Sequence, residues 1–175
     1  MKEKITILLL VLFPFILFGQ NDELVEYSNE LYKYQVAIPS DWSVYYENKN
    51  DTIRKLSIIS WGLPKIQDTI LNQEVENSIS IKAYNRPSIS SLSDLQLNER
   101  LRVDPVKTAM VWDEDGGGFQ RIYHSDNGIE YYGKTFYEFK NGIGYIITFM
   151  ATEGTYDKNV SKFDSFYEQF RVIKK

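Results

Sequence analysis

The sequence predicts an α+β fold in which an antiparallel sheet of about seven or eight strands carries helices on its faces. Three observations support this class. Most of the chain consists of short runs rich in aromatic and β-branched residues, which favour strands. An Asn141-Gly142 dipeptide separates two of these runs, as in a β-hairpin. The C-terminal segment 156–170 has the periodicity of an amphipathic helix.

The first half of the chain is expected to supply four strands and one helix. The strands are predicted at 32–38, 42–46, 56–61 and 78–84, with the second pairing with the first across Pro39-Ser40-Asp41. Residues 20–31 are predicted to be a polar lead-in with a short helical turn, and 62–75 an irregular connection. Ser91 or Ser93 can cap a helix that runs to about Arg102, where Asp104-Pro105 stops it.

The second half is expected to be a meander of strands followed by a helix. Strands are predicted at 107–112, 119–125, 131–139 and 143–151. The final helix has an apolar arc of about 120°, which should pack on a face of the sheet. The residues of this arc are Tyr156, Val160, Phe163, Phe166, Tyr167 and Phe170.

The central hairpin allows two registers. A two-residue loop would place Lys140 opposite Ile143, whereas a three-residue loop would place Phe139 there and Tyr137 opposite Tyr145. The second register gathers one strongly apolar face. Because each large buried side chain contributes about 1.5–3 kcal/mol, we expect the three-residue loop.

The N-terminus predicts export. A basic start is followed by the apolar run Ile5–Phe18 and by Gly19, which is typical of a secretory signal peptide over residues 1–19. A membrane span needs about 20 residues, and this run is shorter. We therefore expect a cleaved signal peptide, with an uncleaved membrane anchor as the alternative. After the lead-in 20–31, residues 32–175 are predicted to form one periplasmic or secreted domain with no stable membrane insertion.

Composition excludes several classes of function. The chain has no cysteine, which excludes disulfides, thiolate chemistry and cysteine-based metal sites. Its net charge is −4, and it has no run of basic residues, so nucleic acid is not an expected partner. A single histidine excludes a multi-histidine metal site. No metal and no cofactor is predicted.

Two local patterns could carry chemistry. His124 lies in a predicted strand, and no motif places a Ser or Asp beside it to form a triad. The segment Asp113-Glu114-Asp115-Gly116 resembles the start of a calcium loop, but the later ligands are missing. We therefore predict no catalytic residue and interpret the acidic segment as a hairpin turn.

Aromatic residues are the compositional excess that points to binding. They make up 15% of the chain, and Tyr and Trp are common anchors at partner surfaces. In Tyr45-Tyr46 and Tyr131-Tyr132, one ring of each pair must face the opposite side of the sheet. Tyr46, Tyr132 and Trp61 are the predicted binding residues, with core packing of the tryptophans as the alternative.

The triplet Asp-Thr-Ile occurs twice, at 51–53 and 68–70, both times in a predicted loop. It resembles the Asp-Thr-apolar triplet that some bacteria O-glycosylate on exported proteins. So short a pattern also occurs by chance.

The segment Tyr34–Trp42, a strand ending in Pro39 with Trp42 three residues later, resembles the opening of PsbP-like domains. The strand 142–150 followed by the final helix is similar to the end of these domains. The family includes the extrinsic subunit of photosystem II, a Ran-binding nuclear-import factor and many bacterial envelope proteins. The resemblance implies an α/β/α sandwich and a non-enzymatic habit of binding partners. The chain lacks the lipid-anchor cysteine of many envelope members.

Taken together, the sequence predicts a non-enzymatic binding module with an envelope or extracellular protein as its partner. Such a module should expose aromatic residues on a fairly flat sheet face. One alternative is a small-ligand or glycan binder, which should have a shallow groove floored by a tryptophan. The other is a carboxylate-dependent hydrolase, which should have a deep pocket with carboxylates clustered around His124.

Overall fold

The computed structural model describes residues 23–112, 119–126 and 128–174. The signal peptide predicted at 1–19 and the acidic turn at 113–116 lie outside these residues. The strands and α-helices, in chain order, are β1 (Leu24–Asn29), β2 (Tyr34–Pro39), β3 (Ser43–Asp51), β4 (Leu56–Gly62), β5 (Ile66–Asp68), β6 (Gln73–Val75), β7 (Ser78–Tyr84), α1 (Leu92–Arg100), β8 (Thr108–Trp112), β9 (Phe119–Asp126), β10 (Ile129–Lys140), β11 (Ile143–Thr152), α2 (Tyr156–Gln169) and β12 (Arg171–Val172).

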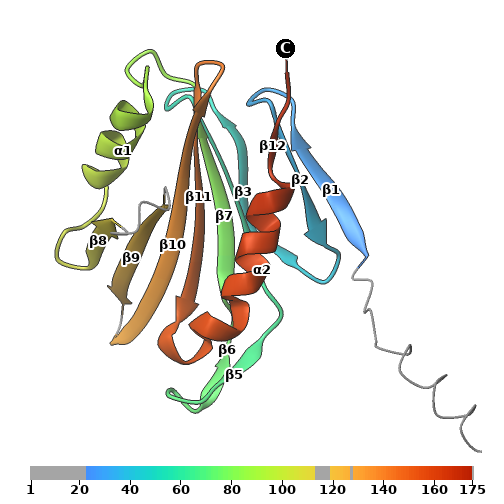
Figure 1. Ribbon diagram of the computed structural model, residues 1–175, viewed down its shortest axis with the longest axis vertical. Coiled ribbons are helices and arrows are strands. Elements are labelled where there is room, and N and C mark those ends of the chain that lie inside the picture. The colour runs from blue at the N-terminus through green and yellow to red at the C-terminus, as the bar shows by residue number, and fades with distance from the viewer. Residues whose placement is uncertain (1–22, 113–118, 127, 175) are drawn as a thin grey trace, which may run out of the picture.

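Seven strands form one antiparallel sheet in the order β3-β4-β7-β11-β10-β9-β8 (Figure 1). A small sheet, β1-β2-β12, and the short β5-β6 hairpin complete the strands. Because the order β7-β11 joins distant parts of the chain, the two halves of the sequence share one sheet. The α+β class, the antiparallel sheet and the helices on its faces are as predicted.

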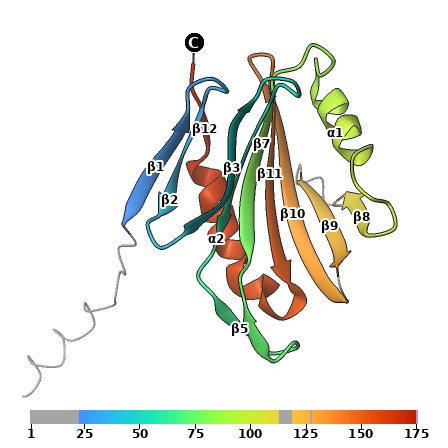
Figure 2. The same ribbon diagram turned by 180° about the vertical axis from the view of Figure 1, so that it is seen from behind.

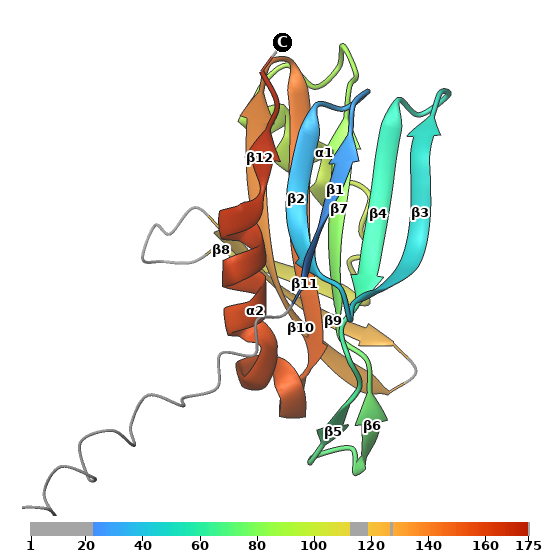
Figure 3. The same ribbon diagram turned by 90° about the vertical axis from the view of Figure 1, so that its right-hand side faces the viewer.

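Helix α2 and the small sheet cover one face of the large sheet together. In Figure 3, α2 and β12 lie on one side of the molecule, β3 and β4 on the other, and β1 and β2 between them. The inward side chains of α2, β2 and the large sheet form the main core. Its fully buried members include Tyr34, Trp61, Tyr145, Phe149 and Phe163.

Helix α1 covers the opposite face, but only toward one end of it (Figure 2). Ser91 caps this helix by accepting a hydrogen bond from the Asp94 amide. Leu95 is the buried apolar anchor, and it packs with Tyr137 and Ile146 in a second, smaller core. A Cβ on Gly144 would lie 2.8 Å from a methyl carbon of Leu95, so the absence of a side chain there lets the helix approach the sheet.

Neither helix in the described ranges is long and apolar enough to cross a membrane.

The central hairpin does not have the predicted register. Lys140 pairs with Ile143, and Asn141 and Gly142 form a two-residue turn with φ of 55° and 79°. The prediction counted burial on only one face of the hairpin, and it was wrong because both faces of β11 are covered. Ile147 and Phe149 enter the main core, while Ile146 enters the core under α1.

Three other predictions for the first half are corrected. Residues 24–29 form β1, not a lead-in with a helical turn, and β1 pairs with β2. The strand after Trp42 runs from Ser43 to Asp51 and pairs with β4, whereas it was expected to pair with residues 32–38 and to end at residue 46. The connection 62–75 contains the β5-β6 hairpin. Both helices were predicted correctly to within about two residues.

Three hairpins have the same kind of four-residue loop, which we call the Asx loop. It begins after Asn29, Asp51 or Asp68, whose side-chain oxygen accepts hydrogen bonds from backbone amides two or three residues later. Its last residue has a positive φ of 53°, 46° and 53° in turn; these residues are Lys33, Lys55 and Asn72. Both Asp-Thr-Ile triplets lie in such loops, with exposed threonines.

The anchoring role of Leu95 can be tested within α1 itself. Leu95 is fully buried, and Leu97 in the same helix is 55% exposed. We expect Leu95→Ala to lower the free energy of unfolding by about 2–5 kcal/mol, because it leaves a cavity over Gly144. The matched control, Leu97→Ala, should change it by less than about 0.5 kcal/mol. Guanidinium unfolding followed by tryptophan fluorescence measures both, and equal effects would contradict this packing.

Candidate functional site

Part of the face that carries α1 is left open. The helix has nine residues and is about 14 Å long, whereas β11 has ten residues and is about 33 Å long. The helix therefore cannot cover the whole length of the strands beneath it. Its contacts are with the apolar end of the face, around Tyr137 and Ile146. The remainder, which we call the open half, has a different composition.

A row of hydroxyl side chains crosses the open half. Ser60, Ser80, Thr148 and Thr135 are direct neighbours on β4, β7, β11 and β10. Thr135 is buried and bonds Thr148 through the two hydroxyls at 3.0 Å. Ser60, Ser80 and Thr148 are half-buried. Four neighbouring strands therefore present hydrogen-bonding groups where the α1 end of the face presents apolar ones.

The next row consists largely of small residues, which keep the floor of the open half low. Across the strands it consists of Gly62, Ser78, Met150 and Gly133, each paired with the next. The Met150 sulfur lies where a Cβ of Gly133 would be. Side chains on the flanking strands therefore rise above this part of the sheet.

These flanking side chains enclose a groove of about 420 Å³, which we call the tyrosine groove. It is lined by Tyr45, Gly62, Glu76, Asn77, Ser78, His124 and Tyr131. The strands that carry the two tyrosines, β3 and β10, are four positions apart in the sheet, or about 19 Å. Tyr45 is 74% exposed, and Tyr131 is half-buried. A β-bulge in β3 lets both Tyr45 and Tyr46 reach this face.

Two polar side chains in the groove are held by neighbours. Glu76 lies where a Cβ of Gly62 would be, and its carboxylate accepts a hydrogen bond from Ser43 at 3.3 Å. His124 is 2.8 Å from the Thr108 hydroxyl through Nδ1 and has its ring 6.3 Å from that of Tyr131. Contacts within the protein therefore hold both side chains in place.

The groove is lined mainly by polar groups and tyrosine rings. Glu76 is the one carboxylate among the described residues that line the groove with His124. Over the described ranges, no three His, Asp or Glu side chains come close enough together to hold a metal ion. Hydroxyl groups and tyrosine rings dominate the surface instead.

Two of the predicted binding residues are at the surface, but on different faces. Tyr46 lies opposite Ser60 on the open half and is 49% exposed. Tyr132 lies on the face covered by α2, where its ring packs edge-on to Tyr123 at 5.3 Å. The negative charge of Glu153, and then burial, raise the pKa of Tyr132 above the ordinary value of a tyrosine.

The third predicted binding residue, Trp61, is buried and cannot contact a partner. Its exposed fraction is 0%, and its ring packs against Tyr27 at 5.3 Å and Phe166 at 5.6 Å. The alternation of β4 places Trp61 on the face under α2. Trp42 is buried as well, so the alternative of core packing holds for both tryptophans.

The sequence analysis missed the residues that complete the groove. Glu76 and Ser78 lie two residues apart around the start of β7, whereas His124 comes from β9, and only the strand order brings it to them. One local signal was available: large apolar residues alternate with serine or glycine over 59–62 of β4 and 78–81 of β7. This pattern indicates two strands that bury one face and expose small residues on the other.

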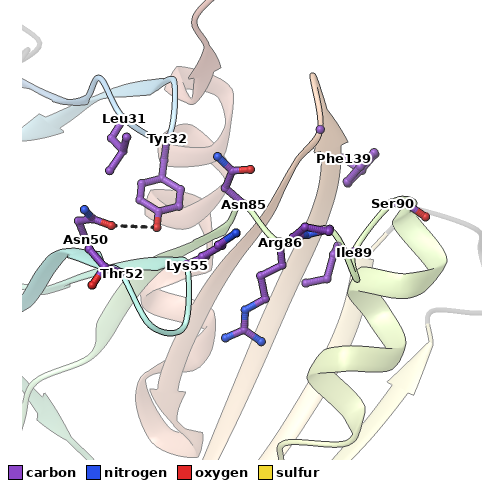
Figure 4. Close-up of a pocket in the computed structure, with 12 residues that line it drawn as sticks. Leu31, Tyr32, Asn50, Thr52, Lys55, Asn85, Arg86, Ile89, Ser90 and Phe139 are labelled. Carbon is purple, nitrogen blue, oxygen red and sulfur yellow. Dashed lines mark hydrogen bonds between the residues drawn. The ribbon is translucent and has the colours of Figure 1, made fainter.

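A second cavity, of about 650 Å³, lies at the other end of the strands, and we call it the basic pocket (Figure 4). Hairpin loops and the β7-α1 connection form its walls. It is lined by Leu31, Tyr32, Asn50, Thr52, Lys55, Asn85, Arg86, Pro87, Ile89, Ser90, Phe139 and Gly142. None of the predicted binding residues lies in it.

No protein-family model matches the chain, and no curated protein matches it. Among solved structures it is similar to the cyanobacterial PsbP of Synechocystis sp. PCC 6803, with 18% identity and a TM-score of 0.47 over 89% of this chain and 96% of that one. The Pseudomonas aeruginosa protein PA94 has 12% identity and a TM-score of 0.48, over 87% and 98%. LpqN of Mycobacterium tuberculosis, which is involved in cell envelope biogenesis, has 12% identity and a TM-score of 0.37, over 89% and 88%. These are similarities of overall fold with TM-scores below 0.5, and the first of the three structures bears the name of the family that the sequence resembles.

The tyrosines of the open half should contribute little to stability. We expect Tyr45→Ala and Tyr46→Ala each to lower the free energy of unfolding by less than about 1 kcal/mol, because both rings are largely exposed. Trp61→Ala should lower it by about 3–5 kcal/mol, because it empties a site in the core. Urea unfolding followed by circular dichroism measures the three values. A large loss for either tyrosine variant would mean that the ring is retained for the fold.

Proposed function

We propose that this protein is a non-enzymatic binding module that uses the open half of its sheet to contact a protein of the cell envelope or the extracellular space. The observation that carries the proposal is the division of one sheet face. Helix α1 closes its apolar end, and hydroxyl groups and tyrosine rings occupy the rest. The location of the partner rests on the signal peptide predicted from the sequence.

The side chains of the open half suit a protein interface. Tyrosine is enriched at such interfaces because its ring offers apolar area and its hydroxyl a hydrogen bond. Tyr45 and Tyr46 expose their rings at the sheet edge, while Ser60, Ser80 and Thr148 provide donors and acceptors beside them. A partner can therefore bury the rings and still satisfy polar groups.

A glycan is the second candidate ligand. The tyrosine groove has a ring near each side, Tyr45 and Tyr131, and polar groups between them, which are Glu76, Ser78 and His124. Aromatic rings stack on sugars, and the polar groups can bond sugar hydroxyls. This candidate differs from the expected one in its platform, because tyrosines and not a tryptophan line the groove.

Site-specific photo-crosslinking tests the protein partner. The chain from Gln20 onward, carrying benzoylphenylalanine in place of Tyr45 or Tyr46, would be irradiated with native envelope extract, and the products identified by mass spectrometry. We expect one protein to be captured from both positions. The control position is Leu97, which is exposed on α1 outside the open half. Capture should fall at least several-fold in a chain that carries Ser80→Lys, because a buried unpaired charge opposes association.

The same experiment separates the two candidates. Equal capture from Leu97 would contradict a specific protein interface on the open half. No capture, together with retention on an immobilised glycan that Tyr131→Ala abolishes, would favour the glycan. Tyr132→Ala, on the other face of the sheet, is the matched control for Tyr131.

A further inference from the structure

The basic pocket is built from four segments that are far apart in the sequence. Leu31 and Tyr32 come from the β1-β2 loop, Thr52 and Lys55 from the β3-β4 loop, Arg86 and Ile89 from the β7-α1 connection, and Phe139 and Gly142 from the central hairpin. Its volume of about 650 Å³ lies within the range of sites for small molecules, about 300–1,000 Å³.

The charge of the pocket is opposite to that of the whole chain. Lys55 and Arg86 line it, and none of its lining residues is acidic. The chain as a whole has a net charge of −4. The nearby carboxylate of Asp51 already faces the Arg54 side chain at 3.6 Å. The positive charge of Lys55 and Arg86 is therefore not cancelled within the pocket.

Arg86 is fixed in place by two contacts. Its Nε donates a hydrogen bond to the Arg54 carbonyl oxygen, and its guanidinium lies 5.1 Å from the centre of the Tyr84 ring. Within the described ranges, its terminal nitrogens have no further hydrogen-bond or ion-pair partner. This side chain brings a positive charge to the pocket without further ordering, which lowers the entropic cost of binding a ligand.

Lys55 has no such contacts. It ends the second Asx loop, and in Figure 4 its side chain extends between Tyr32 and Arg86, with the amino group toward Asn85. In the part of the chain that the structure describes, this amino group has no ion pair and no hydrogen bond. The lysine at the same position of the first Asx loop, Lys33, is 3.9 Å from Glu30.

Lys55 has a positive φ, a backbone conformation that disfavours lysine. A positive φ is uncommon for residues other than glycine, and asparagine is several-fold enriched there. The third Asx loop has Asn72 at this position, and it begins with the same Asp-Thr-Ile triplet as the loop of Lys55. Asparagine therefore fits the conformation, and lysine adds a cation that has no ion pair or hydrogen bond among the described residues.

Apolar groups line the pocket near these cations. Leu31 is 54% exposed, Phe139 is half-buried and Ile89 is buried at the wall. Tyr32 presents its hydroxyl, which donates to Asn50 Oδ1 at 3.4 Å. The lining therefore combines a charged corner with an apolar wall.

We infer that the basic pocket binds a small organic anion, whose carboxylate or phosphate group pairs with Lys55 and whose apolar part contacts Leu31, Ile89 and Phe139. Charge-assisted hydrogen bonds of this kind are among the stronger polar contacts. The inference is independent of the proposed function, because the pocket and the tyrosine groove share no residue.

An NMR titration of the ¹⁵N-labelled chain tests this site with three probes that each contain eight carbon atoms. Octanoate carries a carboxylate, octyl phosphate carries a phosphate, and octanamide is neutral. We expect saturable shifts of the Lys55, Asn85 and Ile89 amides with at least one anion below about 10 mM, and weaker binding of octanamide. The anion that binds more tightly identifies the class of the natural ligand.

Two matched variants isolate the charge. Lys55→Asn should stay folded, because the third Asx loop has asparagine at the same position, and it should weaken anion binding about tenfold or more. Asn72→Lys places the same side chain in the third Asx loop and should leave binding unchanged. Equal affinity for octanamide, unchanged affinity of Lys55→Asn, shifts confined to the tyrosine groove, or no saturable shift with either anion would each overturn the inference.

Discussion

The architecture depends on the register of the central hairpin, which is set by the turn at Asn141-Gly142. With both residues at positive φ, the turn has two residues and pairs Lys140 with Ile143. The pleat of β11 directs Ile147 to one face of the sheet and Ile146 to the other. The register places Phe136 beside Ile147 and Tyr137 beside Ile146. Both faces must then be covered at this strand. Helix α2 with the small sheet covers one face, and α1 covers part of the other.

The register also explains how a sequence pattern can mislead. Counting apolar residues on one face favoured the three-residue loop, whereas the observed register places Lys134 and Glu138 on the face covered by α2. The structure gives each of them a partner on α2: Lys134 bonds Asp164 at 2.7 Å, and Glu138 accepts a hydrogen bond from Tyr167 at 2.8 Å. Polar contacts with a helix that comes later in the chain therefore reverse a preference that strand residues alone suggest.

The fold was more predictable than the site. The helices follow local signals, such as the Ser91 cap and the apolar face of α2, and these signals survive in the structure. The tyrosine groove depends on long-range pairing and on the bulge in β3 that brings Tyr45 to the open half. Trp61 was misplaced because its face is decided by which side of β4 meets α2. Strands that pair in the sheet can lie far apart in the sequence. The periodicity of each strand therefore could not show which side chains meet in this site.

The recurrence of the Asx loop has a consequence for how such a chain can change over time. An Asx side chain at its start and a left-handed residue at its end are enough to define the loop, so the positions between them are free to vary. In the third loop this freedom accompanies docking: Asp68 is buried against Gly154, where a side chain would collide with its carboxylate. In the second loop the same backbone ends freely at a cavity. The same loop geometry can therefore support internal packing at one place and present a variable side chain to a cavity at another.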